Sequence, residues 1–300
     1  MNAVKAHKEQ EKDRHPILAF IGKYPFPVYV VLTLVLGWFP WYLNGDPAAM
    51  VFVPTLTALI VAPLAYGKAG LKDVLSRAVR WRAPWYTWAT ALFAPFVMTS
   101  VAIIIYLLSG NELPNSLLLR GGGIPLAQIG FLILVFLLPF SGAFAEFGFR
   151  GFALPVLQKR WGPLFGTLIL GVFFALWLLP EFYDPDSAQY AMGGVSFLPI
   201  WILTETAWSV LMTWVFNRSR GSSLIAGYIF HAAFNFWTTV LLIDAAMVDG
   251  EFVVGEIDTT LLMLNSAIVI VTALALIIVT KGRLGYPTSE KERESLSVQV

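Results

Sequence analysis

The sequence predicts an all-α polytopic membrane protein, a bundle of about eight transmembrane helices with a cavity open toward the cytoplasmic side. Composition gives the class: of the 300 residues, 57% are hydrophobic and only 13% are charged, and the mean hydropathy is +0.71. Soluble domains carry about 25% charged residues. The chain also contains long apolar runs, and the loops between them alternate between basic and acidic. An integral membrane protein is therefore expected.

Eight apolar stretches reach about 18 residues or more, the length that crosses the hydrocarbon core as a helix. They lie near 25–44, 48–67, 85–108, 124–144, 163–180, 195–216, 222–247 and 260–280. The fourth continues as an amphipathic stretch to about Arg160, and Pro180 and Pro199 lie at or near the ends of the fifth and sixth. No internal repeat or low-complexity tract divides the chain. One domain is the simplest account.

The distribution of Lys and Arg predicts the orientation, since basic loops stay on the cytoplasmic side. Every second loop or tail is basic, at 5–15, 68–82, 158–160, 217–220 and 281–283. The loops between them are acidic and contain Asp46, Glu112, Glu181, Asp184, Asp186, Asp249, Glu251, Glu256 and Asp258. Both termini are therefore expected in the cytoplasm.

This pattern predicts a single transmembrane domain over 25–280, between a cytosolic N-terminal tail of 1–24 and a cytosolic C-terminal tail of 281–300. No small-residue cleavage site precedes the first span, so we expect the first helix to be a retained anchor. A net charge of +1 and the lack of a broad basic face exclude nucleic-acid binding. With no cysteine, the chain has no disulfides, thiol nucleophiles or thiolate metal sites.

Polar and charged residues inside the spans are functional candidates, because a charge in the bilayer is costly unless it is paired or faces the protein interior. They are Glu146, Arg150, Glu205, His231, Asn235 and, near the end of a span, Asp244. Glu146 and Arg150 are four residues apart, as are His231 and Asn235, so each pair shares a helix face. Counted from the basic loops, Glu146, Glu205 and His231 reach similar depths. One polar cluster open to the cytoplasmic side is expected.

Structural interpretations of the same residues stay open at this stage. Glu146 and Arg150 would also serve as a clamp that holds a helix end. His231 and Asn235 would also serve as interhelical hydrogen-bond formers, a common use of polar side chains in bundles. Glu205 would be tolerated in a low-dielectric site as a protonated carboxyl.

Three motifs carry a resemblance to a known family. They are E-F-G-F-R-G-F-A-L-P-V-L-Q-K-R-W-G-P-L from Glu146, G-V-F-F-A-L-W-L-L-P from Gly171, and W-V-F-N-R-S-R-G-S-S-L-I-A-G-Y-I-F-H-A-A-F-N from Trp214. In this order and spacing they resemble the CPBP (Abi, CAAX-endopeptidase-like) intramembrane protease family over about 125–240. The family pattern is E-E-x-x-x-R, then F-x-x-x-H, then H-x-x-x-N or H-x-x-x-D. The resemblance implies a fold of about eight helices.

The resemblance implies roles for four residues and two departures from the pattern. Glu146 and Arg150 match the second Glu and the Arg of the first motif, and His231 and Asn235 match the third motif. Ala145 stands where the first Glu belongs, and Leu178 stands where the second motif has His. In the family the first Glu is thought to activate the attacking water, while the two histidines and the Asn bind a metal or stabilise the oxyanion.

The expected activity follows from these departures. The parent reaction is hydrolysis of a peptide bond in a membrane-associated or CAAX-like substrate, and loss of the base and of one histidine predicts weak or absent turnover. Glu205 is a substitute for the base if its helix faces the cavity. The resemblance implies zinc in the family, with His231 and Asn235 as ligands here. That pair plus Glu205 would be a poor zinc set, and His7 and His15 lie in the tail.

Alternatives of other classes stay open. The second hypothesis is a catalytically dead membrane protein that binds hydrophobic or lipidated peptides in the same cavity, and a third, a transporter, is weaker because no inverted repeat is visible. Ala145 and Leu178 fit either natural degeneration or deliberate substitution. The expected partners are membrane lipids and a hydrophobic or lipidated peptide. A bacterial plasma membrane is the expected location, since the family is abundant there, while no motif indicates the oligomeric state.

Overall fold

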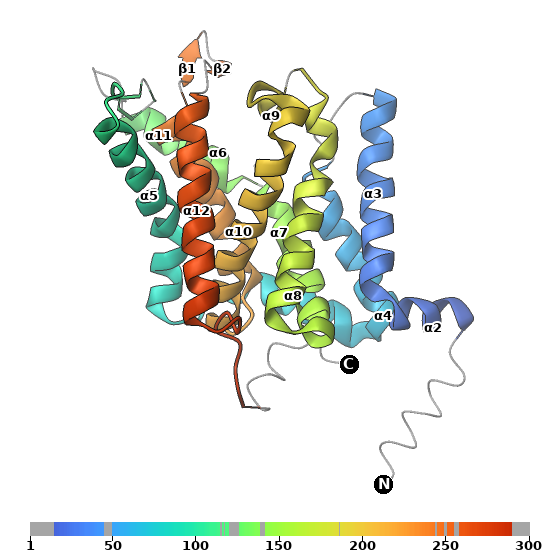
Figure 1. Cartoon of the computed structure of the whole chain (residues 1–300). Coiled ribbons are helices and arrows are strands. Elements are labelled where there is room, and N and C mark those ends of the chain that lie inside the picture. Colours follow the sequence, from blue (N-terminus) through green and yellow to red (C-terminus); the bar gives the residue numbers. More distant parts are fainter. Residues whose placement is uncertain are drawn as a thin grey trace.

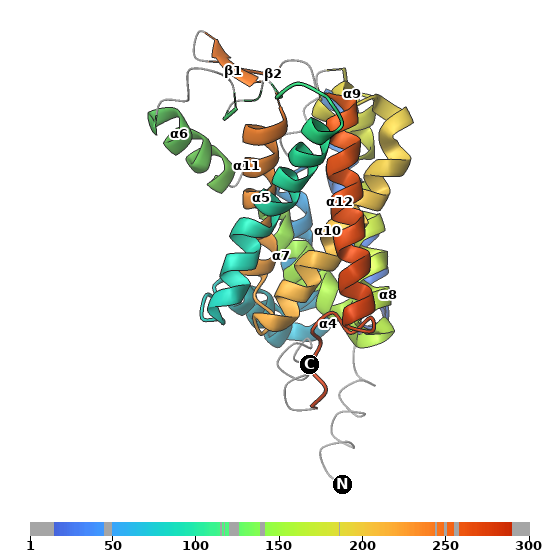
Figure 2. The same ribbon diagram turned by 60° about the vertical axis from the view of Figure 1, so that its left-hand side comes forward.

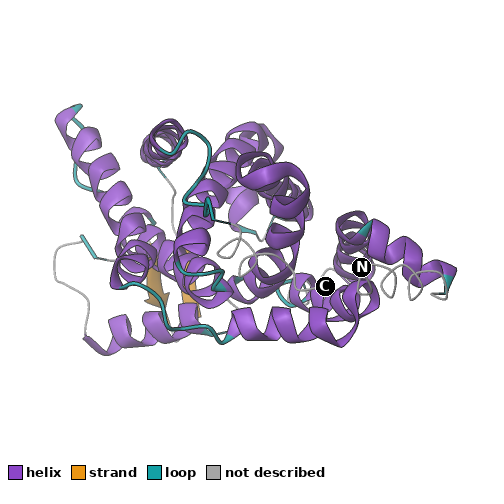
Figure 3. Ribbon diagram, turned by 90° about the horizontal axis from the view of Figure 1, so that it is seen from below, coloured by secondary structure: helices purple, strands orange, loops and turns teal. Residues whose placement is uncertain are grey.

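The fold was taken from a computed structural model of the chain, which describes residues 15–44, 50–114, 116, 118–119, 126–138, 142–185, 187–243, 245–248, 251–254 and 258–289. The described part is a bundle of helices, with one short hairpin as its strand structure (Figures 1 and 3). The longer helices are α2 (Pro16–Lys23), α3 (Pro25–Asn44), α4 (Val53–Ala78), α5 (Trp85–Leu108), α6 (Leu126–Leu137), α8 (Leu154–Trp177), α10 (Leu198–Arg218), α11 (Phe230–Leu242) and α12 (Thr259–Val279).

Short helical turns join these helices near the centre of the bundle and at its ends. They are the 3₁₀ turns η3 (Ala143–Ala145), η5 (Leu179–Phe182) and η6 (Gly194–Phe197), the π turns η4 (Phe149–Ala153) and η7 (Leu224–Ile229), and the short helices α7 (Glu146–Gly148) and α9 (Ala188–Ala191). Strands β1 (Ala245–Val248) and β2 (Glu251–Val254) pair antiparallel, with Ala245 opposite Val254.

The all-α polytopic prediction is confirmed. Six helical stretches of the described chain are long and apolar enough to cross a membrane, and they overlap six of the eight predicted spans over most of their length. The predicted span 48–67 falls on α4, whose apolar first half ends at a bend. The predicted span 124–144 contains α6, which is 12 residues long. The count of eight crossings stays a prediction.

Two glycines redirect long helical runs. At Gly162 the backbone has φ 76°, a left-handed conformation that glycine adopts without steric cost. Beyond it the chain folds back on itself, since a Cβ on Gly166 would lie 2.9 Å from the backbone of Leu157. Gly67, with φ 66°, bends α4 in the same way. Thus the apolar run of 35 residues from Ala143 to Trp177 consists of two segments that meet at Gly162.

Two predicted boundaries need correction. The span 222–247 is too long: α11 ends at Leu242 and β1 begins at Ala245, within the same apolar run. The basic segment 68–82 is helical to Ala78 rather than a loop. The candidates Asp244, Asp46, Asp186, Asp249 and Glu256, and the tail residues 1–14 and 290–300, lie outside the described residues.

The two ends of the bundle differ in charge, as the loop pattern predicts. The bends and helix ends drawn at the bottom of Figure 1 contain Lys68, Lys72, Lys159, Arg160, Arg218, Arg220, Lys281 and Arg283. We call this the basic end. The opposite, acidic end contains α9 and the β hairpin, together with Glu112, Glu181, Asp184 and Asp258. The first and last described residues both lie at the basic end (Figures 1 and 2).

An aromatic core holds α3 against the central turns. Tyr29 is fully buried, and its ring centroid lies 6.4 Å from that of Phe149 and 5.4 Å from that of Phe152. Further along α3, the indole nitrogen of Trp38 donates to the carbonyl of Trp177 over 2.9 Å. A Cβ on Gly37 would lie 1.8 Å from the Trp177 ring, so only glycine fits there. These contacts fix the end of α8, directly before Leu178.

Candidate functional site

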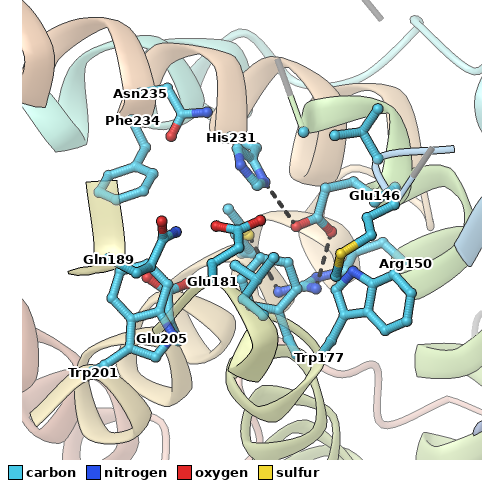
Figure 4. Close-up of a pocket in the computed structure, with 17 residues that line it drawn as sticks. Glu146, Arg150, Trp177, Glu181, Gln189, Trp201, Glu205, His231, Phe234 and Asn235 are labelled. Atoms are coloured by element: carbon cyan, nitrogen blue, oxygen red, sulfur yellow. Dashed lines mark hydrogen bonds and ion pairs between the residues drawn. The ribbon is translucent and has the colours of Figure 1, made fainter. Parts of the chain in front are cut away.

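A buried charged network lies at the centre of the bundle. The Glu146 carboxylate pairs with Arg150 through Oε2 and Nη1 over 2.9 Å, and its Oε1 lies 3.1 Å from Nδ1 of His231 (Figure 4). Glu146 and Arg150 are 1% and 2% exposed. Arg150 also reaches Ser209 and Met212 on α10, at 3.1 and 3.2 Å. The ion pair expected from the i, i+4 spacing is therefore present, and His231 joins it from another helix.

The backbone around Glu146 is shaped by a threonine of α4. The hydroxyl of Thr55 donates to the carbonyl of Phe144 over 2.6 Å and accepts from the amide of Gly148 over 3.1 Å. In a regular α-helix that amide would bond that carbonyl directly. The side chain of Thr55 thus replaces the helical hydrogen bond between Gly148 and Phe144, at the point where η3 ends and α7 begins. It anchors the segment that carries Glu146 to α4.

Close helix approach brings His231 to the carboxylate. The π turn η7 precedes His231, and Gly227 within it lies so near α7 that a Cβ there would be 2.7 Å from Cβ of Glu146. π turns inside α-helices are frequent at functional sites. The His231 ring also packs edge-on against Phe174, with centroids 5.9 Å apart. The imidazole is therefore held between α7, α8 and α11.

The predicted residues line one cavity of about 310 Å³ (Figure 4). Its walls include all five predicted candidates that the structure describes, which are Glu146, Arg150, Glu205, His231 and Asn235. Ala145 and Leu178 line the same cavity. The departures from the family pattern therefore lie in the wall of the site, where they present apolar side chains.

The lining of the cavity extends toward the acidic end. It reaches Glu181 and Gln189, in the segment between α8 and α10. Arg150, whose guanidinium contacts Ser209 and Met212, lines it as well. The opening of the cavity toward the cytoplasmic side stays a prediction.

Glu181 and Gln189 are the site residues that the sequence analysis missed. Both point into the cavity in Figure 4. In the sequence Glu181 is one of the acidic loop residues that predict orientation. The feature that could indicate its place in the site is its position three residues after Leu178, which puts both residues on one side of a helical turn. The chain does continue helically there, as η5.

Glu181→Gln is expected to flatten the pH dependence of thermal stability. Burial, with a smaller effect from the negative charge of Asp184, raises the pKa of Glu181 from 4.5 to about 7. Between those values the folded protein holds a proton that the unfolded chain has lost, so stability falls as pH rises through this window. Gln does not ionise and removes that slope.

The measurement is the unfolding temperature in detergent from about pH 4 to pH 9. Glu112→Gln, at an exposed position of the same end, is the matched control and should track the wild type. Parallel curves for wild type and Glu181→Gln would contradict the assignment.

The residues of the cavity do not fit a zinc site. The described residues contain no group of three His, Asp or Glu side chains placed to hold one metal ion. Nδ1 of His231 is bonded to Glu146, and Leu178 occupies the second histidine position. His15 caps α2, where its Nδ1 accepts from the amide of Ile17. Metal binding by His231 and Asn235 stays a prediction, and no step below depends on it.

Comparison with known proteins finds relatives of the central part of the chain. Residues 127–237 match the family model described as type II CAAX prenyl endopeptidase Rce1-like. CAAX prenyl protease 2 of Methanococcus maripaludis is 31% identical over 110 residues, which cover 35% of this chain and 39% of that protein. Lysostaphin resistance protein A of Staphylococcus aureus is 22% identical over 253 residues, or 81% of this chain and 52% of that protein. Over this region the chain is similar to proteins of the CPBP family.

The matched part of the chain coincides with the site. The range 127–237 contains every cavity residue named above, from Ala145 to Asn235. The likeness to lysostaphin resistance protein A extends over most of the chain. The chain spans about half or less of the length of these two relatives.

Proposed function

We propose that this protein receives a hydrophobic or lipidated peptide in its central cavity and that it hydrolyses that peptide weakly or not at all. One observation carries the proposal: Ala145 and Leu178 line the same cavity as Glu146 and His231. The two groups that the family pattern would add are thus missing from the site itself.

The chemistry of hydrolysis explains the expected loss. Attack on a peptide carbonyl requires a base for the water proton and a donor for the developing negative charge, and each group can be worth orders of magnitude in rate. Both carboxylate oxygens of Glu146 are engaged, one by Arg150 and the other by His231. These two contacts leave neither oxygen of Glu146 free to position a water molecule. Glu205 lines the cavity and is the better substitute base.

Features of the cavity also support a binding role without turnover, which is the second candidate function. Four aromatic side chains, those of Phe174, Trp177, Trp201 and Phe234, line it. Ligand sites are mostly apolar with a few placed polar groups, and this lining has that character. The Glu146–Arg150–His231 network would then serve as a structural clamp.

Restoring the two family residues tests the proposal. Ala145→Glu combined with Leu178→His is expected to cleave a quenched-fluorescence peptide with a prenylated C-terminal cysteine at least about tenfold faster than the wild type. The matched control is Ala145→Gln with Leu178→His, which has the same shape but cannot take a proton. Equal rates for all three proteins, with the peptide bound, would leave binding as the function. A wild type that cleaves rapidly would overturn the proposal.

The basic end is proposed to face the cytoplasm of a bacterium. The observation is the clustering of Lys and Arg at that end, which follows the positive-inside pattern. Because the natural chain has no cysteine, single cysteines report sidedness cleanly. In intact cells a membrane-impermeant maleimide should label Glu112→Cys and spare Arg160→Cys until the membrane is permeabilised. The reverse pattern would invert the orientation.

A further inference from the structure

Two carboxylates of the cavity form no ion pair in the part of the chain that the structure describes. Glu205 is only 5% exposed, and Glu181 is half-buried. Among the described residues neither side chain makes a hydrogen bond or an ion pair, although both line the cavity. Glu205 is thus an unpartnered acidic group at membrane depth that faces open space.

The cations of the cavity are already committed elsewhere. Arg150 is the one Arg or Lys among the described lining residues, and it pairs with Glu146. His231 is bonded to the same carboxylate. Glu181 and Glu205 therefore remain as an excess of acidic groups over basic ones.

Aromatic rings surround the same two carboxylates. In Figure 4, Trp201 and Phe234 lie beside Glu205 and Glu181, on the side of the cavity away from the Glu146–Arg150 pair. We call Glu181, Glu205, Trp201 and Phe234 the acidic-aromatic wall. Aromatic faces attract cations within about 6 Å of the ring centre, most strongly where water is excluded.

The energetics of burial point to what this wall would bind. A buried carboxylate stays ionised only with a partner, because the cost of removing its charge from water is otherwise several kcal/mol. The charge of Arg150 acts on Glu205, but Arg150 is paired with Glu146, so a close partner for an ionised Glu205 would have to come from a ligand. A ligand cation would supply both the ionic partner and the contact with the rings.

We propose that the acidic-aromatic wall binds one positively charged side chain, the ammonium of a lysine or the guanidinium of an arginine, on the peptide that enters the cavity. This rests on the proposed function and adds a specificity to it, namely a basic residue within an otherwise hydrophobic segment. A lipid amine has the same chemistry. The peptide is the chosen source because the wall lines the same cavity as the Glu146–Arg150 pair, where the proposed function places the peptide.

The test compares two peptides in full-length protein. One is a short Leu–Ala peptide with a central lysine, and the other has norleucine in place of that lysine, which keeps the alkyl chain and removes the charge. Binding is measured by fluorescence anisotropy in phosphatidylglycerol nanodiscs, which contain no amine lipid. The wild type is expected to bind the lysine peptide about tenfold more tightly, a preference within reach of one ion pair and a cation–π contact.

Variants assign the preference to the wall. Glu181→Gln with Glu205→Gln should reduce it to near unity, whereas Glu112→Gln, an exposed acidic residue of the same end, should leave it intact. Unfolding temperatures establish that each variant is folded. The ratio of the two peptide affinities in the wild type tests the inference without any variant. Equal binding of both peptides by the wild type would overturn this inference and leave the proposed function standing.

Other outcomes are equally decisive. No binding of either peptide would overturn the inference and the proposed function together. In a further outcome the wild type binds both peptides equally and retains phosphatidylethanolamine, while the double variant loses that lipid. This result would assign the cation to a lipid and overturn the assignment to a peptide.

Discussion

Arg150→Met is expected to destabilise the protein by about 3–5 kcal/mol, the cost of leaving a buried charge without its partner. The Glu146 carboxylate is 1% exposed, and its other contact is a single bond to His231. Met keeps much of the length of the Arg side chain. The decrease in the free energy of unfolding therefore measures the loss of the charge rather than the creation of a cavity. The measurement is the free energy of unfolding by denaturing detergent.

The double variant separates the charge from the packing. Glu146→Gln with Arg150→Met removes both charges and should recover a large part of the loss, because a neutral pair has no uncompensated charge to bury. The buried Asp73–Arg77 pair of α4, bonded over 3.1 Å, is a matched control outside the cavity. Arg77→Met should destabilise without changing ligand binding. A cost below about 1 kcal/mol for Arg150→Met would mean that water reaches Glu146 in the membrane.

Gly148→Ala is expected to cost about 3 kcal/mol or more, at the upper end of what overpacking costs. Its added Cβ would lie 2.2 Å from the carbonyl oxygen of Pro54, a backbone atom that no rotamer change can move away. Relief would require α7 to separate from α4, which would break the bonds of Thr55 to Phe144 and Gly148. Unfolding by denaturing detergent again gives the magnitude.

Gly151→Ala is the matched control, three residues along the same segment. The nearest atom to its Cβ would be the hydroxyl of Ser223 at 3.4 Å, an ordinary contact. Its cost should stay within about 1 kcal/mol, as for a tolerated glycine substitution. Similar losses for both variants would show that the close approach of α4 at Gly148 is not the cause of the loss.

Much of the site was predictable because the bilayer makes polar residues conspicuous. Glu146, Arg150, His231 and Asn235 stand out in apolar runs at i, i+4 spacing, and the structure places all four on one cavity. The place of Glu205 in the cavity was predictable from its depth along its helix. The place of Glu181 was not, because in the sequence an acidic residue beyond a span resembles any other loop residue.

Other features escaped prediction for physical reasons of their own. The β hairpin begins within the apolar run that continues α11, and an apolar run by itself does not distinguish a helix from strands. The bond between Glu146 and His231 depends on the close approach of Gly227 to Glu146, between segments distant in sequence. Local pattern contains no information about such contacts.

The reversal at Gly162 determines the direction in which every later helix crosses the bundle. Without it, the apolar run from Ala143 to Trp177 would continue in one direction, and α10, α11 and α12 would each enter the bundle from the opposite face. His231 lies on one of these downstream helices and Glu146 lies upstream of the turn. One residue with a left-handed backbone thus sets the sidedness of the second half of the chain, and with it whether the two halves of the site can meet.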